Sequence, residues 1–167
     1  MIISVLIPCF NEKDTIEEIV NRINDLKNIN TEIIIIDDFS NDGTTEILKE
    51  KINHKVSKII FNETNSGKGY CIKKGIEIAQ GEIILIQDAD LEYDPKEYYK
   101  LTKPIIDGNA EVVYGSRFIG GDERRILFFW HTIANKFLTF LSNMFTNLNL
   151  TDMETCYKVF KKEIIKK

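Results

Sequence analysis

The residues Glu82-Ile83-Ile84-Leu85-Ile86-Gln87-Asp88-Ala89-Asp90-Leu91-Glu92 decide the fold of this chain. A run of apolar residues, mostly β-branched, follows Gly81 and stops at acidic side chains, the pattern of a buried central strand that ends at a site. In an extended backbone Asp88 and Asp90 project to the same side, and Glu92 continues that side. The stretch predicts either a site built on converging carboxylates or a solvated acidic turn.

A cation site follows from the first of these two interpretations. Carboxylates that converge on one point repel one another unless a cation lies between them. Hard oxygen ligands favour Mg²⁺ or Mn²⁺, which use one or two carboxylates and take further ligands from substrate phosphates. We therefore expect Mg²⁺ or Mn²⁺ as the cofactor, with Asp88, Asp90 and Glu92 as candidate ligands.

The composition is that of a single soluble globular domain covering residues 1–167, with 43% hydrophobic and 29% charged residues. The formal charge of −4 gives no reason to expect a nucleic-acid partner. The three cysteines show no metal-ligand or CxxC spacing, so we expect reduced thiols in a cytoplasmic protein. The chain ends soon after residue 160, so we expect a catalytic domain that lacks a C-terminal portion.

The order of elements predicts an α/β domain with a mainly parallel central sheet flanked by helices. Strands are expected at 2–7, 33–36, 58–61, 83–86 and 111–114. Amphipathic helices are expected after Asp14, around Ile47, through Ile72 and Ile76, and from Asp94 to about residue 107. Pro8 is expected to close the first strand.

Polar residues follow four of the expected strands, at residues 9–12, 37–38, 88–92 and 116–117. In parallel sheets ligands bind beyond the carboxyl ends of the strands. This recurrence favours a site over a solvated turn, and the architecture favours a nucleotide. No G-x-G-x-x-G follows the first strand, and Ser66-Gly67-Lys68-Gly69 lacks two residues that a P-loop requires.

Six stretches, in order along the chain, resemble the motifs of family 2 glycosyltransferases. They are residues 5–12, 36–44, 65–69, 87–90, 115–118 and 150–158. The fourth is similar to the DxD metal motif, and the last two resemble the polyprenyl-phosphate (dolichyl-phosphate) mannose or glucose synthase branch. This resemblance implies the GT-A fold, a Rossmann-like nucleotide-binding sandwich. It also implies transfer of a hexose from a nucleotide-diphosphate sugar, with inversion, to a polyprenyl phosphate.

The resemblance also assigns roles to particular residues. Asp88 and Asp90 would hold the divalent cation on the donor diphosphate, and Glu92 stands where several relatives carry glutamine. Asp38 would accept a hydrogen bond from the base. The expected nucleotide-binding residues are Pro8, Phe10, Asn11, Glu12, Asp38, Lys68, Asp88 and Ala89.

The expected catalytic residues are Asp90, Arg117 and Asp152. Arginine binds phosphate bidentately, so Arg117 would hold the acceptor phosphate or the donor. Arg124 and Arg125 are either a second phosphate contact or a surface pair. Asp152 matches the catalytic base of inverting relatives. A hydroxyl acceptor needs such a base, whereas a phosphate acceptor is already an anion, and Asp152 would then orient groups.

The stretch 126–150 is too apolar for an ordinary surface helix, and His131 is expected to pack within it. It is either a core helix or an interfacial helix that lies on the cytosolic face of a membrane, where Trp and Phe are favoured. Its aromatic residues would also suit a homodimer. The remaining alternatives are a saccharide or other hydroxyl acceptor, or a nucleotide-sugar-binding domain without transfer activity. The choice between UDP and GDP stays open.

Overall fold

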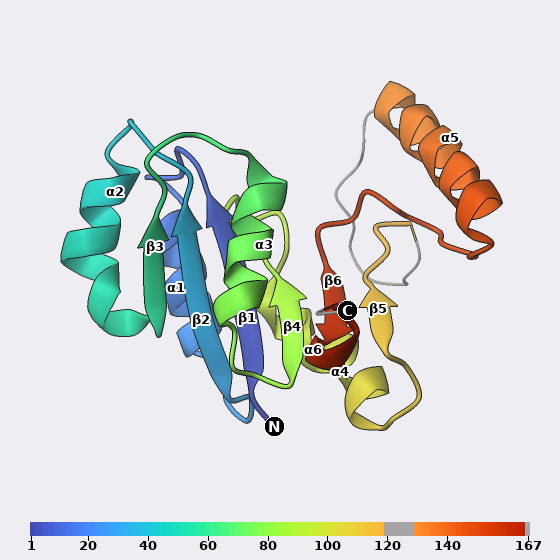
Figure 1. Ribbon diagram of the computed structural model, residues 1–167, viewed down its shortest axis with the longest axis horizontal. Helices are drawn as coiled ribbons and strands as arrows, with labels where there is room; N and C mark the ends of the chain where they lie inside the picture. The colour runs from blue at the N-terminus through green and yellow to red at the C-terminus, as the bar shows by residue number, and fades with distance from the viewer. Residues whose placement is uncertain (119–128, 166–167) are drawn as a thin grey trace.

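The computed structural model describes residues 1–118 and 129–165, which form an α/β sandwich around one six-stranded sheet (Figure 1). The strand order is β3-β2-β1-β4-β6-β5. The strands are β1 (Ile3–Cys9), β2 (Thr31–Asp37), β3 (Lys58–Phe61), β4 (Ile83–Ile86), β5 (Val112–Tyr114) and β6 (Lys158–Lys161). The helices are α1 (Ile16–Asn24), α2 (Thr44–Ile47), α3 (Lys68–Ile78), α4 (Tyr98–Ile106), α5 (Phe129–Thr146) and α6 (Lys162–Ile165). Short helical turns are η1 (Leu48–Ile52), η2 (Asn53–Lys55) and η3 (Pro95–Glu97).

The first four strands are parallel and confirm the predicted class of sheet. β1 continues through Pro8, which pairs with Ile36, to Cys9, so the prediction that Pro8 closes the strand is wrong. Pro removes only one backbone donor, and the burial of the flanking residues keeps the strand extended. Helix α4 is preceded by η3, whose N-cap Asp94 accepts a hydrogen bond from the backbone N–H of Lys96.

The sixth strand was not predicted. β6 lies between β4 and β5 and is antiparallel to both, so it is the one described strand of the sheet that runs the opposite way. Its sequence Lys-Val-Phe-Lys has no run of apolar residues, and only Val159 is fully buried. Four residues with mixed polarity carry too little periodicity to indicate a strand. The pairing brings residues 150–158 beside the carboxyl end of β4.

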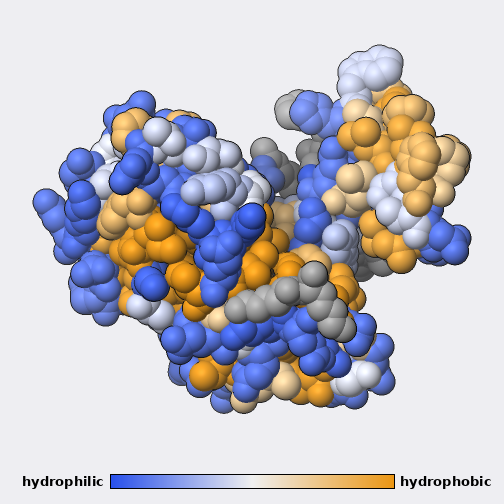
Figure 2. Space-filling model, in the orientation of Figure 1, coloured by the Kyte–Doolittle hydropathy of each residue, from blue (hydrophilic) through white to orange (hydrophobic). Residues whose placement is uncertain are grey.

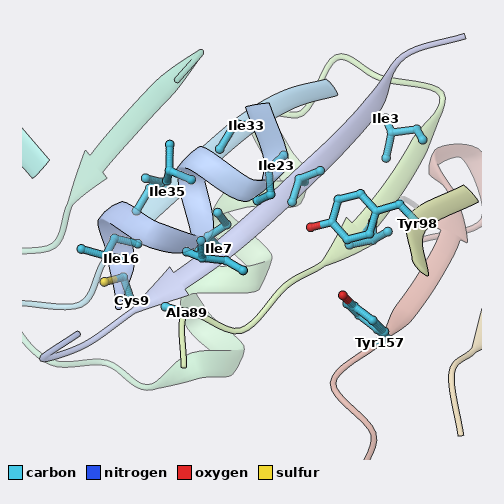
Figure 3. Packing of buried hydrophobic residues seen from close by; sticks show 14 of the residues in the cluster. Ile3, Ile7, Cys9, Ile16, Ile23, Ile33, Ile35, Ala89, Tyr98 and Tyr157 are labelled. Atoms are coloured by element: carbon cyan, nitrogen blue, oxygen red, sulfur yellow. The ribbon is translucent and has the colours of Figure 1, made fainter. Parts of the chain in front are cut away.

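Alternate residues of the strands face two separate cores. On one face of the sheet the odd-numbered residues of β1 and β2 pack against α1, α4 and Tyr157, as Figure 3 shows for Ile7, Ile16 and Ile35. On the other face Leu6, Ile34, Ile36 and Ile84 form a smaller cluster beneath α3. This alternation explains why β1, β2 and β4 read as continuous apolar runs, since both of their faces are buried.

Helix α5 stands away from the sheet, at the upper right of Figure 1. Its buried residues are the polar Asn135 and Thr139, while its large apolar side chains are exposed. The alternative that this stretch forms a core helix is therefore wrong for residues 129–146. Figure 2 shows apolar residues gathered on the outer surface of this helix. Within the described part of the chain, no helix has the length and hydropathy of a bilayer span.

Helix α3 approaches the sheet closely at Gly75. A Cβ atom at this position would lie 3.0 Å from Cδ2 of Leu6 and 3.1 Å from Cδ1 of Ile36, and both of these side chains are fully buried. The same helix carries Gly69, where a Cβ atom would meet nothing within 4 Å. The two glycines therefore form a pair within one helix that differs in packing against the sheet.

We expect Gly75→Val to lower the free energy of unfolding by about 2 kcal/mol, because the added atoms overpack the contact with Leu6 and Ile36. For a domain of this size the melting temperature should fall by about 4 to 8 °C. Gly69→Val is the control and should change the stability by less than about 0.5 kcal/mol. Equal melting temperatures for the two variants would contradict the close approach of α3.

Candidate functional site

A cavity of about 250 Å³ lies at the carboxyl ends of β1, β2 and β4, where the sequence places the site. The loops after these three strands and the first turn of α3 form its walls. The lining residues are Pro8, Cys9, Phe10, Glu12, Asp38, Lys68, Cys71, Asp88, Ala89 and Asp90. Seven of the eight predicted nucleotide-binding residues line the cavity, all except Asn11. Cys9 and Cys71 also line the cavity as buried, reduced thiols, and burial raises their pKa values, but the sequence analysis assigned neither of them a role in the site.

Asn11 connects two loops and does not line this cavity. Its backbone N–H donates to Oγ of Ser40, and its side-chain Oδ1 accepts from the backbone N–H of Asn41, at 2.9 Å each. Its φ of 58° places it in the left-handed region, which asparagine tolerates better than most residues. Asn11 thus holds the loop after β1 to the loop after β2, and its contact with the nucleotide stays a prediction.

The carboxylate of Asp38 is buried and holds the loop that leads into α3. It accepts hydrogen bonds from Nδ2 of Asn62 at 2.7 Å, from the backbone N–H of Ser66 at 3.0 Å and from that of Gly67 at 2.7 Å. Burial raises the pKa of Asp38, but these hydrogen bonds outweigh it, so the pKa lies below the ordinary value. Asp38 therefore shapes one wall of the cavity, and its hydrogen bond to a base stays a prediction.

Lys68 and Asp88 form an ion pair across the cavity, with Nζ 2.5 Å from Oδ1. Burial opposes the charge of Lys68, but the hydrogen bond that Lys68 donates to Asp88 and the negative charge of Asp88 raise the lysine pKa. Asp90 lines the same cavity, and its pKa is raised by burial and by the charges of Asp88 and Glu92. The carboxylates of Asp88 and Asp90 and the ammonium group of Lys68 thus face the same cavity.

The extended backbone that the prediction assumed for residues 88–92 is absent, and the role of Glu92 as a metal ligand stays a prediction. β4 ends at Ile86, and Leu91 has a φ of 62°, so the backbone turns instead of staying extended as the prediction assumed. The backbone N–H of Glu92 donates to Oδ1 of Asp90 at 3.0 Å, and its side chain is not among those that line the cavity.

The carboxylates of the cavity fit a cation that takes part of its ligands from a substrate. Within residues 1–118 and 129–165, no three His, Cys, Asp or Glu side chains form a metal-ligand cluster. Asp88 and Asp90 alone suit Mg²⁺ or Mn²⁺, which bind through one or two carboxylates and complete their shell with phosphate oxygens and water.

Arg117 and Asp152 meet in a bidentate ion pair beyond the end of β5. Nε of Arg117 lies 2.8 Å from Oδ2 of Asp152 and Nη2 lies 2.9 Å from Oδ1, while the backbone N–H of Arg117 also donates to Oδ2. Asn135 of α5 adds a fourth donor at 3.0 Å. Burial raises the pKa of Asp152, but these partners outweigh it and hold the pKa below its usual range.

The segment that leads into β6 brings this ion pair toward the cavity. Sγ of Cys156 lies 3.7 Å from the backbone oxygen of Ile86, the last residue of β4, and the backbone N–H of Cys156 donates to the hydroxyl of Tyr93. The two predicted groups of site residues therefore belong to one edge of the sheet. Arg124, Arg125 and the beginning of the apolar stretch, 126–128, lie outside the described residues.

The comparisons with known proteins agree with this architecture. Residues 4–167 match the model of the family described as glycosyl transferase family 2. The dolichol-phosphate mannosyltransferase of Pyrococcus furiosus is 32% identical over 137 residues, which cover 81% of this chain and 39% of that protein. The UDP-N-acetylglucosamine–dolichyl-phosphate N-acetylglucosaminyltransferase of Methanococcus voltae is 30% identical, over 99% of this chain and 71% of the relative.

A solved structure shares the fold at lower sequence identity. The glucosyl-3-phosphoglycerate synthase of Mycobacterium tuberculosis, crystallised with Mn²⁺, UDP and phosphoglyceric acid, superposes with a TM-score of 0.73 at 20% identity, over 97% of this chain and 56% of that one. The sheet and its flanking helices have the GT-A fold. By the match over residues 4–167, the chain belongs to glycosyl transferase family 2.

Proposed function

We propose that this chain is the catalytic domain of a metal-dependent inverting glycosyltransferase, which moves a hexose from a UDP- or GDP-sugar to a polyprenyl phosphate. The observation that carries the proposal is that one sheet edge holds both a carboxylate-lined cavity and the Arg117–Asp152 pair. The names of the Pyrococcus and Methanococcus relatives, which refer to dolichol phosphate and dolichyl phosphate, support the choice of acceptor.

The cavity would bind the nucleotide diphosphate of the donor. Pro8, Phe10 and Glu12 would contact the base and ribose, while Asp88 and Asp90 would hold Mg²⁺ or Mn²⁺. The bound cation would neutralise the charge that develops on the departing diphosphate. Lys68, which already lies against Asp88, would add a positive charge on the same side.

Arg117 would bind the acceptor phosphate, and Asp152 would position Arg117. Asp152 accepts hydrogen bonds from three donors of Arg117 and one of Asn135, and these partners stabilise its ionised form. Such a carboxylate is a poor proton acceptor, because protonation would break these interactions. A phosphate acceptor needs no base, so this geometry favours polyprenyl phosphate over a hydroxyl acceptor.

Helix α5 would lie in the membrane interface beside the acceptor. Its polar residues Asn135, Thr139 and Asn143 point inward and hydrogen-bond with the segment 150–154, so its apolar residues face outward. The most exposed of these are Phe129, Trp130, Phe140 and Phe145. This arrangement reverses that of a helix on a water-soluble surface and suits the interface of a bilayer. A peripheral location on the cytosolic face would follow.

Transfer activity tests the proposed reaction. With Mn²⁺, a polyprenyl phosphate and radiolabelled UDP- or GDP-hexoses, we expect labelled lipid in the organic phase with at least one donor. Asp90→Asn should lower the rate by at least about a hundredfold, because it weakens the cation site. Asp94→Asn, which retains an N-cap, is the control and should stay active. Label that reaches only a hydroxyl acceptor, or no acceptor at all, would overturn the proposal.

The pairing of Asp152 predicts a stability that depends on pH. The folded pKa is lowered, so the stabilisation is present above the unfolded value of about 3.9 and is lost as the pH falls through the folded value. Asp152→Asn should lower the free energy of unfolding by about 2 kcal/mol at pH 7. This loss is below that of a fully buried pair, because Arg117 keeps some water contact.

Urea unfolding of the wild type and Asp152→Asn at neutral and at acidic pH checks this expectation. The difference between the two proteins should shrink below about pH 4. Asp107→Asn removes an exposed pair with Lys103 and should cost less than about 0.5 kcal/mol at either pH. A difference between wild type and Asp152→Asn that stays constant with pH would contradict the ion pair.

The single tryptophan of the chain, Trp130, reports directly on α5. Phospholipid vesicles should shift its fluorescence to shorter wavelength and protect it from acrylamide, because the indole would leave water. Neutral and anionic vesicles should act alike, since the exposed face of α5 is apolar. The double variant Phe137→Ser, Phe140→Ser should weaken binding, whereas Tyr99→Ser, an exposed aromatic on α4, should not.

Two results would count against the membrane assignment. The first is an unchanged Trp130 spectrum at saturating lipid. The second is a spectral shift that follows protein concentration and an increase in molecular mass without lipid, which would indicate that a second copy of the chain covers α5.

A further inference from the structure

Lys158 is the first residue of β6 and lies at the same sheet edge as the cavity. Ile84 pairs with Phe160 and Tyr114 pairs with Lys158. Continuing the antiparallel register by two residues sets Lys158 beside Ile86, immediately before the segment that carries Asp88. The residue therefore stands between the ends of β4 and β5, between the two halves of the proposed site.

The side chain of Lys158 lies on the α3 face of the sheet. Its neighbour Val159 is fully buried in the opposite core, and side chains alternate along a strand. Nζ of Lys158 lies 5.4 Å from the centroid of the Tyr114 ring, which packs edge-on against Phe160. These two aromatic rings support a half-buried ammonium group on the side of the sheet where Lys68 begins α3.

In the described part of the chain, Lys158 lacks the carboxylate partner that each of the neighbouring basic residues has. Lys68 is paired with Asp88, and Arg117 is paired with Asp152. Among the described residues, no carboxylate lies within ion-pair distance of Lys158, and its ammonium group lies over the face of the Tyr114 ring. Burial and the charge of Lys68 lower the pKa of Lys158, and the charges of Asp152 and Asp88 oppose this.

A half-buried lysine without an anionic partner is unfavourable for the fold alone. Partial burial of an ammonium group is compensated only when a counter-charge or hydrogen-bond acceptors are close. The cation–π contact with the ring of Tyr114 offsets only part of the free-energy cost of burying the ammonium group. A polar group kept in this state next to a cavity is typical of a residue that serves a ligand.

We propose that Lys158 is a phosphate-binding residue that donates to a phosphoryl oxygen between the DxD carboxylates and Arg117. This assignment rests on the proposed function, since that reaction brings two phosphate groups to this edge. The oxygen belongs either to the diphosphate of the donor or to the phosphate of the lipid acceptor. Lys158 is the last residue of the motif at 150–158, and the sequence alone assigns it no role.

Binding measurements on Lys158→Gln decide the assignment and its source. In one arm, titration calorimetry measures the affinity for UDP and GDP in the presence of Mn²⁺. In the other arm, it measures the affinity for a short, water-soluble isoprenyl monophosphate, with the uncharged isoprenol as the reference ligand. We expect a loss of about tenfold or more in one arm, as for the loss of a charged hydrogen bond, and no change for the isoprenol.

Matched variants separate a binding role from a structural one. Lys161→Gln makes the same change at the other end of β6, opposite Ile83, and should leave both affinities unchanged. Lys158→Arg should retain most of the affinity. The melting temperature of Lys158→Met should equal or exceed that of the wild type, because the substitution removes an unpaired charge from a half-buried position.

The outcomes distinguish this assignment from the proposed function. A loss confined to the nucleotide arm assigns the donor diphosphate, and a loss confined to the lipid arm assigns the acceptor phosphate. If the wild type binds both phosphates and the folded Lys158→Gln variant binds both equally well, the assignment falls while the proposed function stands. If the wild type binds nucleotide but transfers no sugar to polyprenyl phosphate, the proposed acceptor falls and the nucleotide arm alone decides the role of Lys158. If the wild type binds neither phosphate, both proposals fall.

Discussion

The antiparallel pairing of β6 between β4 and β5 is the constraint on which the whole site depends. Without it, β5 would have no partner in the sheet, and Arg117 after β5 would have no fixed position relative to Asp88 after β4. The burial of Val159 and Tyr157 on one face secures the strand in its register. Because register sets the position of every side chain, a slip of one residue would turn Lys158 into the core.

Much of this architecture could be predicted from the sequence, because the parallel strands are encoded locally. The apolar runs of β1, β2 and β4 are long and uniform, and the polar residues that end them meet at one edge by topology alone. The features that were missed depend on distant partners or on single dihedral angles. β6 is a strand only because two others flank it, and the backbone after Asp90 is not extended because one residue, Leu91, has a positive φ angle.

The orientation of helix α5 also could not be predicted from the local sequence. Its apolar composition was evident, but composition does not say which face is buried. The direction is set by Asn135, Thr139 and Asn143, which bond to the segment 150–154 and so turn the aromatic side chains outward. The carboxylate of Asp152 thus organises both Arg117 and the helix proposed to meet the membrane, and it would couple the position of the proposed acceptor phosphate to that of its lipid.

The two edges of the sheet differ in a way that itself points to function. At the amino ends of the strands, Glu32 accepts hydrogen bonds from Ser4, Gln80 and Gly81, so the polar groups there are paired with one another. At the carboxyl ends, Phe39 and Leu91 adopt positive φ angles that disfavour bulky side chains, and like-charged carboxylates share one cavity. Two bulky residues with positive φ angles and two like-charged carboxylates thus lie at the edge where a ligand would bind, and such an arrangement is typical of a functional site.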